Sequence, residues 1–301
     1  MTAREHADID EWIRAASADP IEHRRRQAVE VLIRAISTNN AMRETLYLKG
    51  GTLMNILYSS PRMTNDIDFT TLAMRDGFRD QIVTALNHDM NLAALDLGYT
   101  QFRFRVQTTE MRPPQPEFPW PTLLMTIGFA THRSREETML ARGQSPRTLR
   151  VDISFNETVY DWQEIEITDP TRELGADRHT SIILAYSPLE VIAEKLRAIL
   201  QQKIRNRYRR QDIYDIARLV SARPLMPGQI SKVFEIFLAK CHDREIEPTI
   251  DMIGDPELYQ RSRERYGEMR LDRGGSSFDF EADFAQVAAF YRAMPWPPAQ
   301  T

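Results

Sequence analysis

Residues 48–52 read Leu-Lys-Gly-Gly-Thr, and residues 62–69 read Arg-Met-Thr-Asn-Asp-Ile-Asp-Phe. The two glycines let the backbone approach a ligand closely, and the free N–H groups of a helix that starts near Thr52 favour an anion such as a phosphate. Asp66 and Asp68 are two residues apart on a predicted strand, so their side chains point to the same face. Two carboxylates at this spacing suit a hard divalent cation, usually Mg²⁺, that also takes phosphate oxygens from its substrate. The stretch therefore predicts nucleotide chemistry.

Taken together, these motifs resemble the signature of the DNA polymerase beta superfamily of nucleotidyltransferases. Within it, the stretches at 48–52 and 62–69 are most similar to the AbiEii-type nucleotidyltransferase toxins of type IV toxin–antitoxin systems. Two later segments continue the likeness: a helix with Lys195 in its middle, and the pair Asp212 and Asp215 behind Arg210. The resemblance covers roughly residues 45–220, in an intact order.

The resemblance implies roles for individual residues. Members of this superfamily place a third carboxylate, from a neighbouring strand, beside the Asp-x-Asp pair. The metal ligands implied here are Asp66, Asp68 and Asp152, and the catalytic set adds Lys195 and Asp212. The nucleotide-binding residues implied are Lys49, Gly50, Gly51, Thr52 and Arg62.

Alternative interpretations of these residues have ordinary structural grounds. Asp152 lies on the polar side of an alternating segment, where an aspartate is usually an exposed strand residue. Lys195 borders the apolar stripe of its helix, a position typical of a lysine that extends its ammonium to solvent. Asp212 lies where a helix N-terminus favours a carboxylate.

Length and composition bound the class of protein. A chain of 301 residues exceeds the usual single-domain size, and its 42% hydrophobic and 27% charged residues are ordinary for a soluble globular protein. The formal net charge of −4 gives no global attraction to nucleic acid, so any site for a polyanion must be local. Cys241 is the only cysteine, which excludes an intramolecular disulfide and fits a reducing compartment. Without an apolar membrane span or a leader peptide pattern, the sequence is interpreted as cytoplasmic.

Hydrophobic periodicity predicts an α+β fold in two domains. For residues 1–175 the resemblance implies a polymerase-beta-like nucleotidyltransferase domain with a mixed sheet and helices, and the helical pattern predicts an all-helical C-terminal domain over 176–301. Strands are predicted at 45–48, 66–69, 102–106, 122–130, 149–155 and, as the last one, 164–168. Helices are predicted at 21–38, after residue 52, at 78–92, from Ser187, and at 228–241, 255–269 and 281–294. A linker is expected at 169–177, a flexible joint at 271–277, and a capping box between Ser187 and Glu190.

Two arginine-rich segments are candidates for phosphate contact. The first is Arg24-Arg25-Arg26, which is more typical of a solvated helix face. The second is the basic run from Lys203 to Arg210, whose predicted RNA-binding residues are Arg205, Arg207, Arg209 and Arg210. Pairing of these side chains with acidic neighbours is the competing interpretation.

Three functions from different classes remain open at this point. The resemblance favours a toxin that transfers nucleotides from an NTP to the 3′ end of a tRNA, with Mg²⁺ as cofactor and a cognate antitoxin as partner. A second hypothesis is a nucleotidyltransferase that modifies a protein or a small molecule. A third is an inactive module that binds a nucleotide or a partner, which the intact carboxylates disfavour.

Overall fold

The computed structural model describes residues 4–73, 75–115, 117–168, 180–271 and 278–298. The chain divides into two compact units. Unit 1 comprises Met1–Ser59 and Met63–Ala185, and unit 2 comprises Ser60–Arg62 and Tyr186–Thr301. The chain thus enters unit 2 for three residues, between the glycine motif and the Asp-x-Asp motif, long before its C-terminal part. The predicted linker at 169–177 and most of the predicted joint at 271–277 lie outside the described residues.

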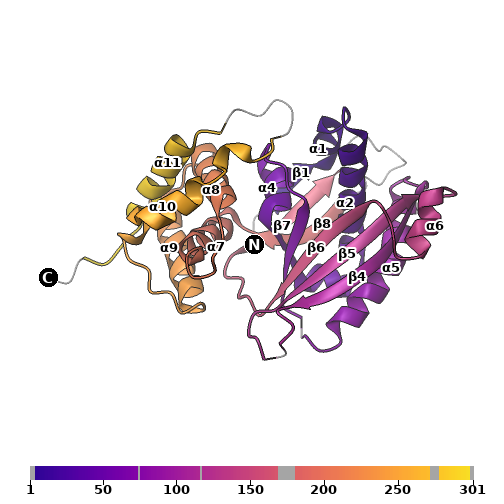
Figure 1. Cartoon of the computed structure of the whole chain (residues 1–301), viewed down its shortest axis with the longest axis horizontal. Coiled ribbons are helices and arrows are strands. Elements are labelled where there is room, and N and C mark those ends of the chain that lie inside the picture. The colour runs from indigo at the N-terminus through magenta and orange to yellow at the C-terminus, as the bar shows by residue number, and fades with distance from the viewer. Residues whose placement is uncertain (1–3, 74, 116, 169–179, 272–277, 299–301) are drawn as a thin grey trace. The chain divides into compact units, whose positions relative to one another are not determined.

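Unit 1 is built on a mixed sheet, in which the described residues form eight strands in the order β1-β7-β8-β2-β3-β6-β5-β4 (Figure 1). The strands are β1 (Arg4–Asp8), β2 (Leu46–Lys49), β3 (Asp66–Thr71), β4 (Phe102–Arg112), β5 (Thr122–Thr131), β6 (Thr148–Phe155), β7 (Trp162–Thr168) and β8 (Thr180–Tyr186). Strand β3 runs antiparallel to β2 and parallel to β6, so the Asp-x-Asp strand has a partner on both sides.

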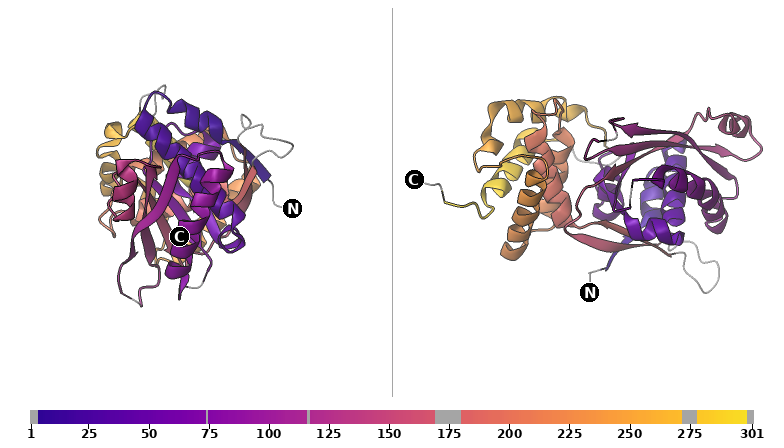
Figure 2. Two further views of the ribbon diagram at one scale, coloured as in Figure 1. Left: turned by 90° about the vertical axis from the view of Figure 1, so that its right-hand side faces the viewer. Right: turned by 90° about the horizontal axis from the view of Figure 1, so that it is seen from below.

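The helices of unit 1 leave one face of the central strands to polar residues. They are α1 (Ile9–Ala15), α2 (Pro20–Thr38), α3 (Asn40–Thr45), α4 (Gly50–Tyr58), α5 (Phe78–Asp96) and α6 (Arg135–Ala141). Helices α2 and α5 pack together against the sheet (Figure 2). On β6 the odd-numbered side chains face this layer, since the rings of Phe155 and Phe78 meet edge to face at 5.2 Å. The even-numbered side chains, Asp152 among them, therefore point to the opposite face.

The structure corrects two expectations, one about the last strand of the sheet and one about the length of the helix predicted at 255–269. Strand β8 pairs with β2, although Glu164–Thr168 was expected to be the last strand. Its apolar run, Ile182 to Ala185, is short, and periodicity alone does not separate so short a run from a buried helix segment. The helix expected at 255–269 ends at Arg263, because Arg265 adopts a left-handed conformation with φ of 56°.

In the described part of unit 2 the regular elements are helical, apart from a single β-bridge between Arg62 and Leu271. They are α7 (Pro188–Gln201), α8 (Arg210–Ala222), α9 (Pro227–His242), η1 (Met252–Gly254), α10 (Pro256–Arg263), η2 (Tyr266–Glu268) and α11 (Phe280–Arg292). At the start of α7, Ser187 caps the helix as the predicted capping box requires. The Ser187 hydroxyl accepts the N–H of Glu190 at 3.1 Å, while the buried Glu190 carboxylate pairs with Lys240 at 2.7 Å.

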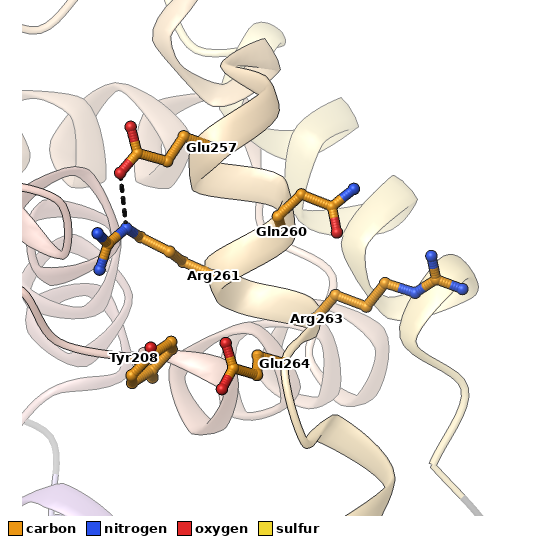
Figure 3. A pocket seen from close by; sticks show the side chains of 6 residues that line it. All are labelled: Tyr208, Glu257, Gln260, Arg261, Arg263 and Glu264. Atoms are coloured by element: carbon orange, nitrogen blue, oxygen red, sulfur yellow. Dashed lines mark hydrogen bonds and ion pairs between the residues drawn. The ribbon is translucent and has the colours of Figure 1, made fainter.

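A hollow of about 410 Å³ lies beside α10 (Figure 3). It is lined by Tyr208, Glu257, Gln260, Arg261, Arg263 and Glu264. None of the described helices is long and apolar enough to cross a membrane.

Candidate active site

The strand register of unit 1 brings three aspartates to one face of the sheet. In the parallel pair of β3 and β6, Asp68 stands directly opposite Asp152, and Asp66 stands opposite Arg150. In the antiparallel pair of β2 and β3, Lys49 stands opposite Asp68. Paired residues on neighbouring strands project to the same side, so Lys49, Asp68 and Asp152 form one transverse row. Asp66 lies one step along the same face.

Burial and nearby negative charges raise the pKa of Asp152. Burial raises the pKa of this carboxyl first, and the nearby charges of Asp68 and Asp66 raise it further, to about 6. The opposing effects of Arg150 and Lys49 are smaller. The three carboxylates thus repel one another, an arrangement that a cation or a proton would relieve.

The glycine motif approaches the same carboxylates. Helix α4 begins at Gly50, two residues earlier than expected, and Gly50 has a φ of 69°. A Cβ atom on Gly50 would lie 2.1 Å from Asp68 Oδ2, so only glycine leaves room for that carboxylate. Gly51 and Thr52 follow in the first turn of α4, and the Thr52 hydroxyl donates to the Asp66 carbonyl at 3.1 Å. The glycine turn and the Asp-x-Asp strand are thus packed as one structure.

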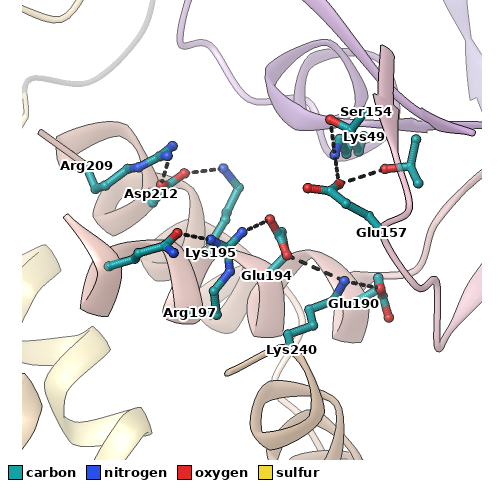
Figure 4. A network of polar contacts seen from close by, with 12 residues as sticks. Lys49, Ser154, Glu157, Glu190, Glu194, Lys195, Arg197, Arg209, Asp212 and Lys240 are labelled. Atoms are coloured by element: carbon teal, nitrogen blue, oxygen red, sulfur yellow. Dashed lines mark hydrogen bonds and ion pairs between the residues drawn. The ribbon is translucent and has the colours of Figure 1, made fainter. Parts of the chain in front are cut away.

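Lys49 is held by a residue that the sequence did not single out. Its ammonium donates to the Glu157 carboxylate and, at 3.2 Å, to the Ser154 hydroxyl (Figure 4). The same Glu157 oxygen accepts the hydroxyl of Thr70 at 3.1 Å. Glu157 lies two residues after the end of β6, and a single glutamate after a strand carries no sequence signal that separates it from a loop residue.

Carboxylate donors for a metal are present, but they do not form a closed cage. Within the described residues, no group of three or more His, Cys, Asp or Glu side chains is placed to hold a metal ion by itself. Mg²⁺ is usually held by one or two carboxylates together with substrate phosphates. The donor set of Asp66, Asp68 and Asp152 therefore fits a cation that binds together with a triphosphate.

A second charged cluster lies inside unit 2, where opposite charges alternate. The Lys195 ammonium contacts Asp212 Oδ1 at 2.7 Å and Asp215 Oδ2 at 2.9 Å. The Arg62 guanidinium binds the Asp215 carboxylate through two hydrogen bonds, of 3.1 Å and 2.8 Å. All four side chains are buried, and Asp215 is fully buried. The Arg62 contact brings the segment that precedes β3 into this cluster.

The charges of this cluster support one another. Burial opposes ionisation of Asp215, yet Arg62 and Lys195 outweigh it and lower the pKa of Asp215 to about 2. Burial also lowers the pKa of Lys195, but Asp212 and Asp215 overcome this effect and raise it. Lys195 is therefore a buried ion-pair partner in this structure, rather than a lysine at the margin that extends to solvent.

The basic run lies in the turn between α7 and α8, and its side chains from Lys203 to Tyr208 are exposed. Lys203 pairs with Glu257 at 2.7 Å, and Arg209 lies 3.7 Å from Asp212, as labelled in Figure 4. Arg210 begins α8, half-buried, while Arg205 and Arg207 lie in the exposed part of the turn. Lys203 and Arg209 thus have acidic partners, as the competing interpretation expects, and phosphate contact by the exposed Arg205 and Arg207 stays a prediction.

The arginines at 24–26 do not form a solvated face. Arg26 is buried, with its guanidinium bound to Glu22 at 2.9 Å and to the Trp12 carbonyl at 2.6 Å. Arg25 pairs with Glu22 and donates to the Thr64 carbonyl at 2.8 Å. The expectation was wrong because Glu22, at helical spacing, draws these cations onto the body of unit 1. Arg25 instead supports the turn that leads into β3.

Comparison with known proteins identifies the family. The family model described as the nucleotidyl transferase AbiEii toxin of a type IV toxin–antitoxin system matches residues 32–289, most of the chain. The chain belongs to this family. No curated protein matches the sequence. The family supports a nucleotidyl transfer enzyme, as the resemblance of the glycine and Asp-x-Asp motifs indicated.

Solved structures place the AbiEii-family chain among nucleotidyltransferase folds. MenT4, a nucleotidyltransferase toxin from Mycobacterium tuberculosis, superposes with a TM-score of 0.53 at 14% identity, over 94% of this chain and 88% of that one. JHP933 from Helicobacter pylori gives a TM-score of 0.43 at 12% identity, over 89% of each chain. At these identities the likeness concerns the fold alone, and it is the mixed sheet with its helices that matches a nucleotidyltransferase toxin.

The AbiEii motifs therefore lie in two places. Asp66, Asp68, Asp152 and the glycine turn come together in unit 1, and Lys195 with Asp212 come together in unit 2. Sequence reasoning missed two partners, Glu157 and the Arg62–Asp215 pair. A signal for Asp215 was present, because it stands one helical turn after Asp212 and would share its face.

Proposed function

We propose that this chain transfers a nucleotide from an NTP to the 3′ end of a tRNA, and that the modified tRNA then fails in translation and growth stops. The observation that carries the chemistry is the row in which Asp68 faces Asp152, with Asp66 on the same face and Gly50 against the Asp68 carboxylate. Membership of the AbiEii family supports the toxin role and, with it, a cognate antitoxin as partner.

Mg²⁺ held by Asp66 and Asp68, with Asp152, would offset the charge of the triphosphate and stabilise the attacking and leaving oxygens. Residues of the chain itself position the substrate phosphates. The N-terminal turn of α4, with Gly50, Gly51 and Thr52, presents backbone N–H groups to the phosphates of the departing pyrophosphate. Lys49, fixed by Glu157, keeps a positive charge in the carboxylate row.

We assign to Asp152 the removal of the proton from the attacking hydroxyl of the acceptor. Asp152 stands directly opposite Asp68 in the strand register, so its carboxylate faces the side of the sheet on which the substrate would bind. It can therefore accept the proton of a ribose 3′-hydroxyl as that oxygen attacks the α-phosphorus. The bond from that phosphorus to the bridging oxygen breaks, and pyrophosphate leaves.

Unit 2 supplies the remaining roles in this proposal. The family resemblance is what assigns Lys195 to the charge on the leaving pyrophosphate, and within unit 2 Asp212 fixes the position of its ammonium. Arg62 was expected to bind nucleotide, but its guanidinium is engaged by Asp215. We therefore assign Arg62 to the support of Asp215, and through it of Lys195.

We assign binding of the RNA acceptor to the basic turn, the run from Lys203 to Arg210. Arg205, Arg207, Arg209 and Arg210 are clustered in a chain of negative net charge, which supports a local phosphate-backbone contact. A tRNA offers such a backbone together with a free 3′-hydroxyl.

The test is to incubate the purified protein with each α-labelled NTP, Mg²⁺ and total RNA, and to locate the label. We expect label in the tRNA fraction, and none after periodate oxidation has destroyed the terminal ribose diol. Label in protein, or in a small molecule, would contradict the acceptor assignment while leaving the nucleotidyl transfer intact. The absence of transfer with all four NTPs would contradict the enzymatic proposal.

A further inference from the structure

The basic turn of unit 2 carries an exposed aromatic ring beside a hollow. Tyr208 is 47% exposed and lies between Arg207 and Arg209 in the sequence. Across the hollow, the Arg261 guanidinium lies 5.9 Å from the centre of the Tyr208 ring, within reach of a cation–π contact (Figure 3). An exposed ring next to an arginine is the pair of groups on which a flat aromatic ligand stacks.

The hollow is held in shape by a buried amide. The Gln202 side chain, 1% exposed, donates to the Leu258 carbonyl at 3.2 Å and to the Ser262 hydroxyl at 3.0 Å, both on α10. Its oxygen accepts the N–H of Arg209 at 3.3 Å. One side chain therefore ties both ends of the basic run to α10, so the two walls of the hollow are fixed relative to each other.

Further contacts fix the Arg261 side chain. Its guanidinium donates to Glu257 at 2.9 Å and to the Asn206 side chain at 3.1 Å. Glu257 also pairs with Lys203 at 2.7 Å, so two cations offset its charge. Arg261 is thus oriented before any ligand arrives, which lowers the entropic cost of binding.

The chemistry of the lining selects the ligand. The lining sets Arg261 and Arg263 against Glu257 and Glu264, which disfavours an apolar small molecule, while the arginines of the adjoining basic run favour a polyanion. A ligand that combines a flat π-face with an anionic backbone is a nucleotide of unpaired RNA.

We infer that Tyr208 and Arg261 form a stacking site for one unpaired base of the RNA acceptor, with Arg205 and Arg207 on the adjoining phosphates. The inference rests on the proposed function in one respect, that the acceptor is RNA. It adds that the acceptor is recognised through a single-stranded nucleotide as well as through its backbone charge.

The first test measures binding of a fluorescent single-stranded oligoribonucleotide by anisotropy, without NTP. Base–aromatic stacking is lost in Tyr208→Ala, so its Kd should rise by about ten-fold or more, while Tyr208→Phe, which keeps the ring, should bind like the wild type. Tyr160→Ala is the matched control, since Tyr160 is a tyrosine of unit 1 that is 38% exposed. Thermal melting of each variant separates loss of contact from loss of fold.

The second test removes the base instead of the ring. An oligonucleotide with abasic positions should bind the wild type about as weakly as the intact oligonucleotide binds Tyr208→Ala, and the two changes together should cost little more than either alone. Additive losses would overturn the inference, and so would an unchanged Kd in Tyr208→Ala, which would leave the hollow to a protein partner.

The outcomes separate this inference from the proposed function. If RNA binding depends on salt but its Kd is unchanged in Tyr208→Ala, the stacking site is overturned and tRNA remains the proposed acceptor. Stacking-dependent RNA binding by a protein that transfers no nucleotide would overturn the proposed function and leave the stacking site.

Discussion

The two charged clusters of this chain are balanced in opposite ways. In unit 1, burial and the charges of Asp68 and Asp66 raise the pKa of Asp152 to about 6. In unit 2, burial of Asp215 is outweighed by Arg62 and Lys195, and its pKa falls to about 2. Both groups are aspartates in secondary structure, so the difference comes from their neighbours and not from their residue type.

This contrast separates a cluster that costs stability from one that supplies it. A group whose charged form is disfavoured in the fold lowers stability at neutral pH, and such groups gather at functional sites. A buried aspartate with two cationic partners stabilises the fold as long as all partners remain. The carboxylate row therefore does not stabilise the fold, whereas the cluster around Asp215 stabilises it whether or not it takes part in catalysis.

The largest effect expected from this contrast is the loss of nucleotide transfer when Asp68 is replaced. In Asp68→Ala, nucleotide transfer should fall by orders of magnitude, because the carboxylates act as a unit on one substrate. The free energy of unfolding should change by less than about 1 kcal/mol, since the substitution relieves repulsion. Label transfer and urea unfolding measure the two quantities.

Asp80→Ala serves as the control, because Asp80 lies exposed on α5. It should leave both quantities unchanged. An Asp68→Ala protein that transfers nucleotide at the normal rate would show that the row is not the catalytic site.

The next effect is structural and belongs to unit 2. Asp215→Ala leaves Arg62 and Lys195 without their shared buried partner, and loss of one member of a buried pair costs about 3–5 kcal/mol. Glu268→Ala breaks the exposed pair with Arg265 in the same unit and should leave stability nearly unchanged. Urea unfolding compares the two variants. Equal losses would mean that the cluster around Asp215 contributes no more to stability than a surface ion pair.

Much of the carboxylate row could be predicted from the sequence, for a local reason. Asp66 and Asp68 share a face because strand side chains alternate, and alternation is visible in the sequence itself. That Asp152 lies opposite Asp68 depends on the pairing of β3 with β6, in which the paired residues lie more than eighty positions apart in the sequence. The family resemblance supplied that pairing, and periodicity did not.

The partners of the cations could not be predicted. Arg26 was expected on a solvated face, yet its guanidinium reaches Glu22 and a carbonyl on another helix. Lys49 was expected near phosphates, and its partner Glu157 is more than a hundred residues away. Long cationic side chains choose partners in three dimensions, and a helical or strand period does not encode that choice. Strand β8 was missed for a different reason, since its short apolar run fits a buried strand and a buried helix segment equally well.

A third effect tests how closely the glycine turn and the carboxylate row depend on each other. Gly50→Ala places a methyl group against Asp68 and should lower transfer by about 10²-fold, as misplacement of a catalytic group does. Gly98→Ala is the matched control, because Gly98 has a similar φ of 72° but no atom within 4 Å of a Cβ. Both variants carry backbone strain on the order of 1 kcal/mol, and only the first should lose activity. Equal activity in the two variants would separate the turn from the row.

The smallest effect compares the two aspartates directly through pH. Because the pKa of Asp152 in the fold, about 6, lies above its ordinary value of 3.8, its cost is fully present above pH 6 and is relieved as the pH falls towards 4. Asp152→Asn should therefore be more stable than the wild type at pH 8, by about 1 kcal/mol after screening by solvent, and the gain should vanish near pH 4.

Asp215→Asn should behave in the opposite sense. The pKa of Asp215 in the fold, about 2, lies below the same ordinary value, so the stability it supplies is present above pH 4 and is lost as the pH falls towards 2. The variant should be less stable than the wild type at pH 8, and the difference should shrink only in strong acid. Urea unfolding from pH 8 to pH 3, with a chelator present so that no cation lowers the carboxyl pKa values, measures both curves. Parallel curves for the two variants would remove the distinction between the clusters, since it rests on opposite signs for two aspartates of one chain.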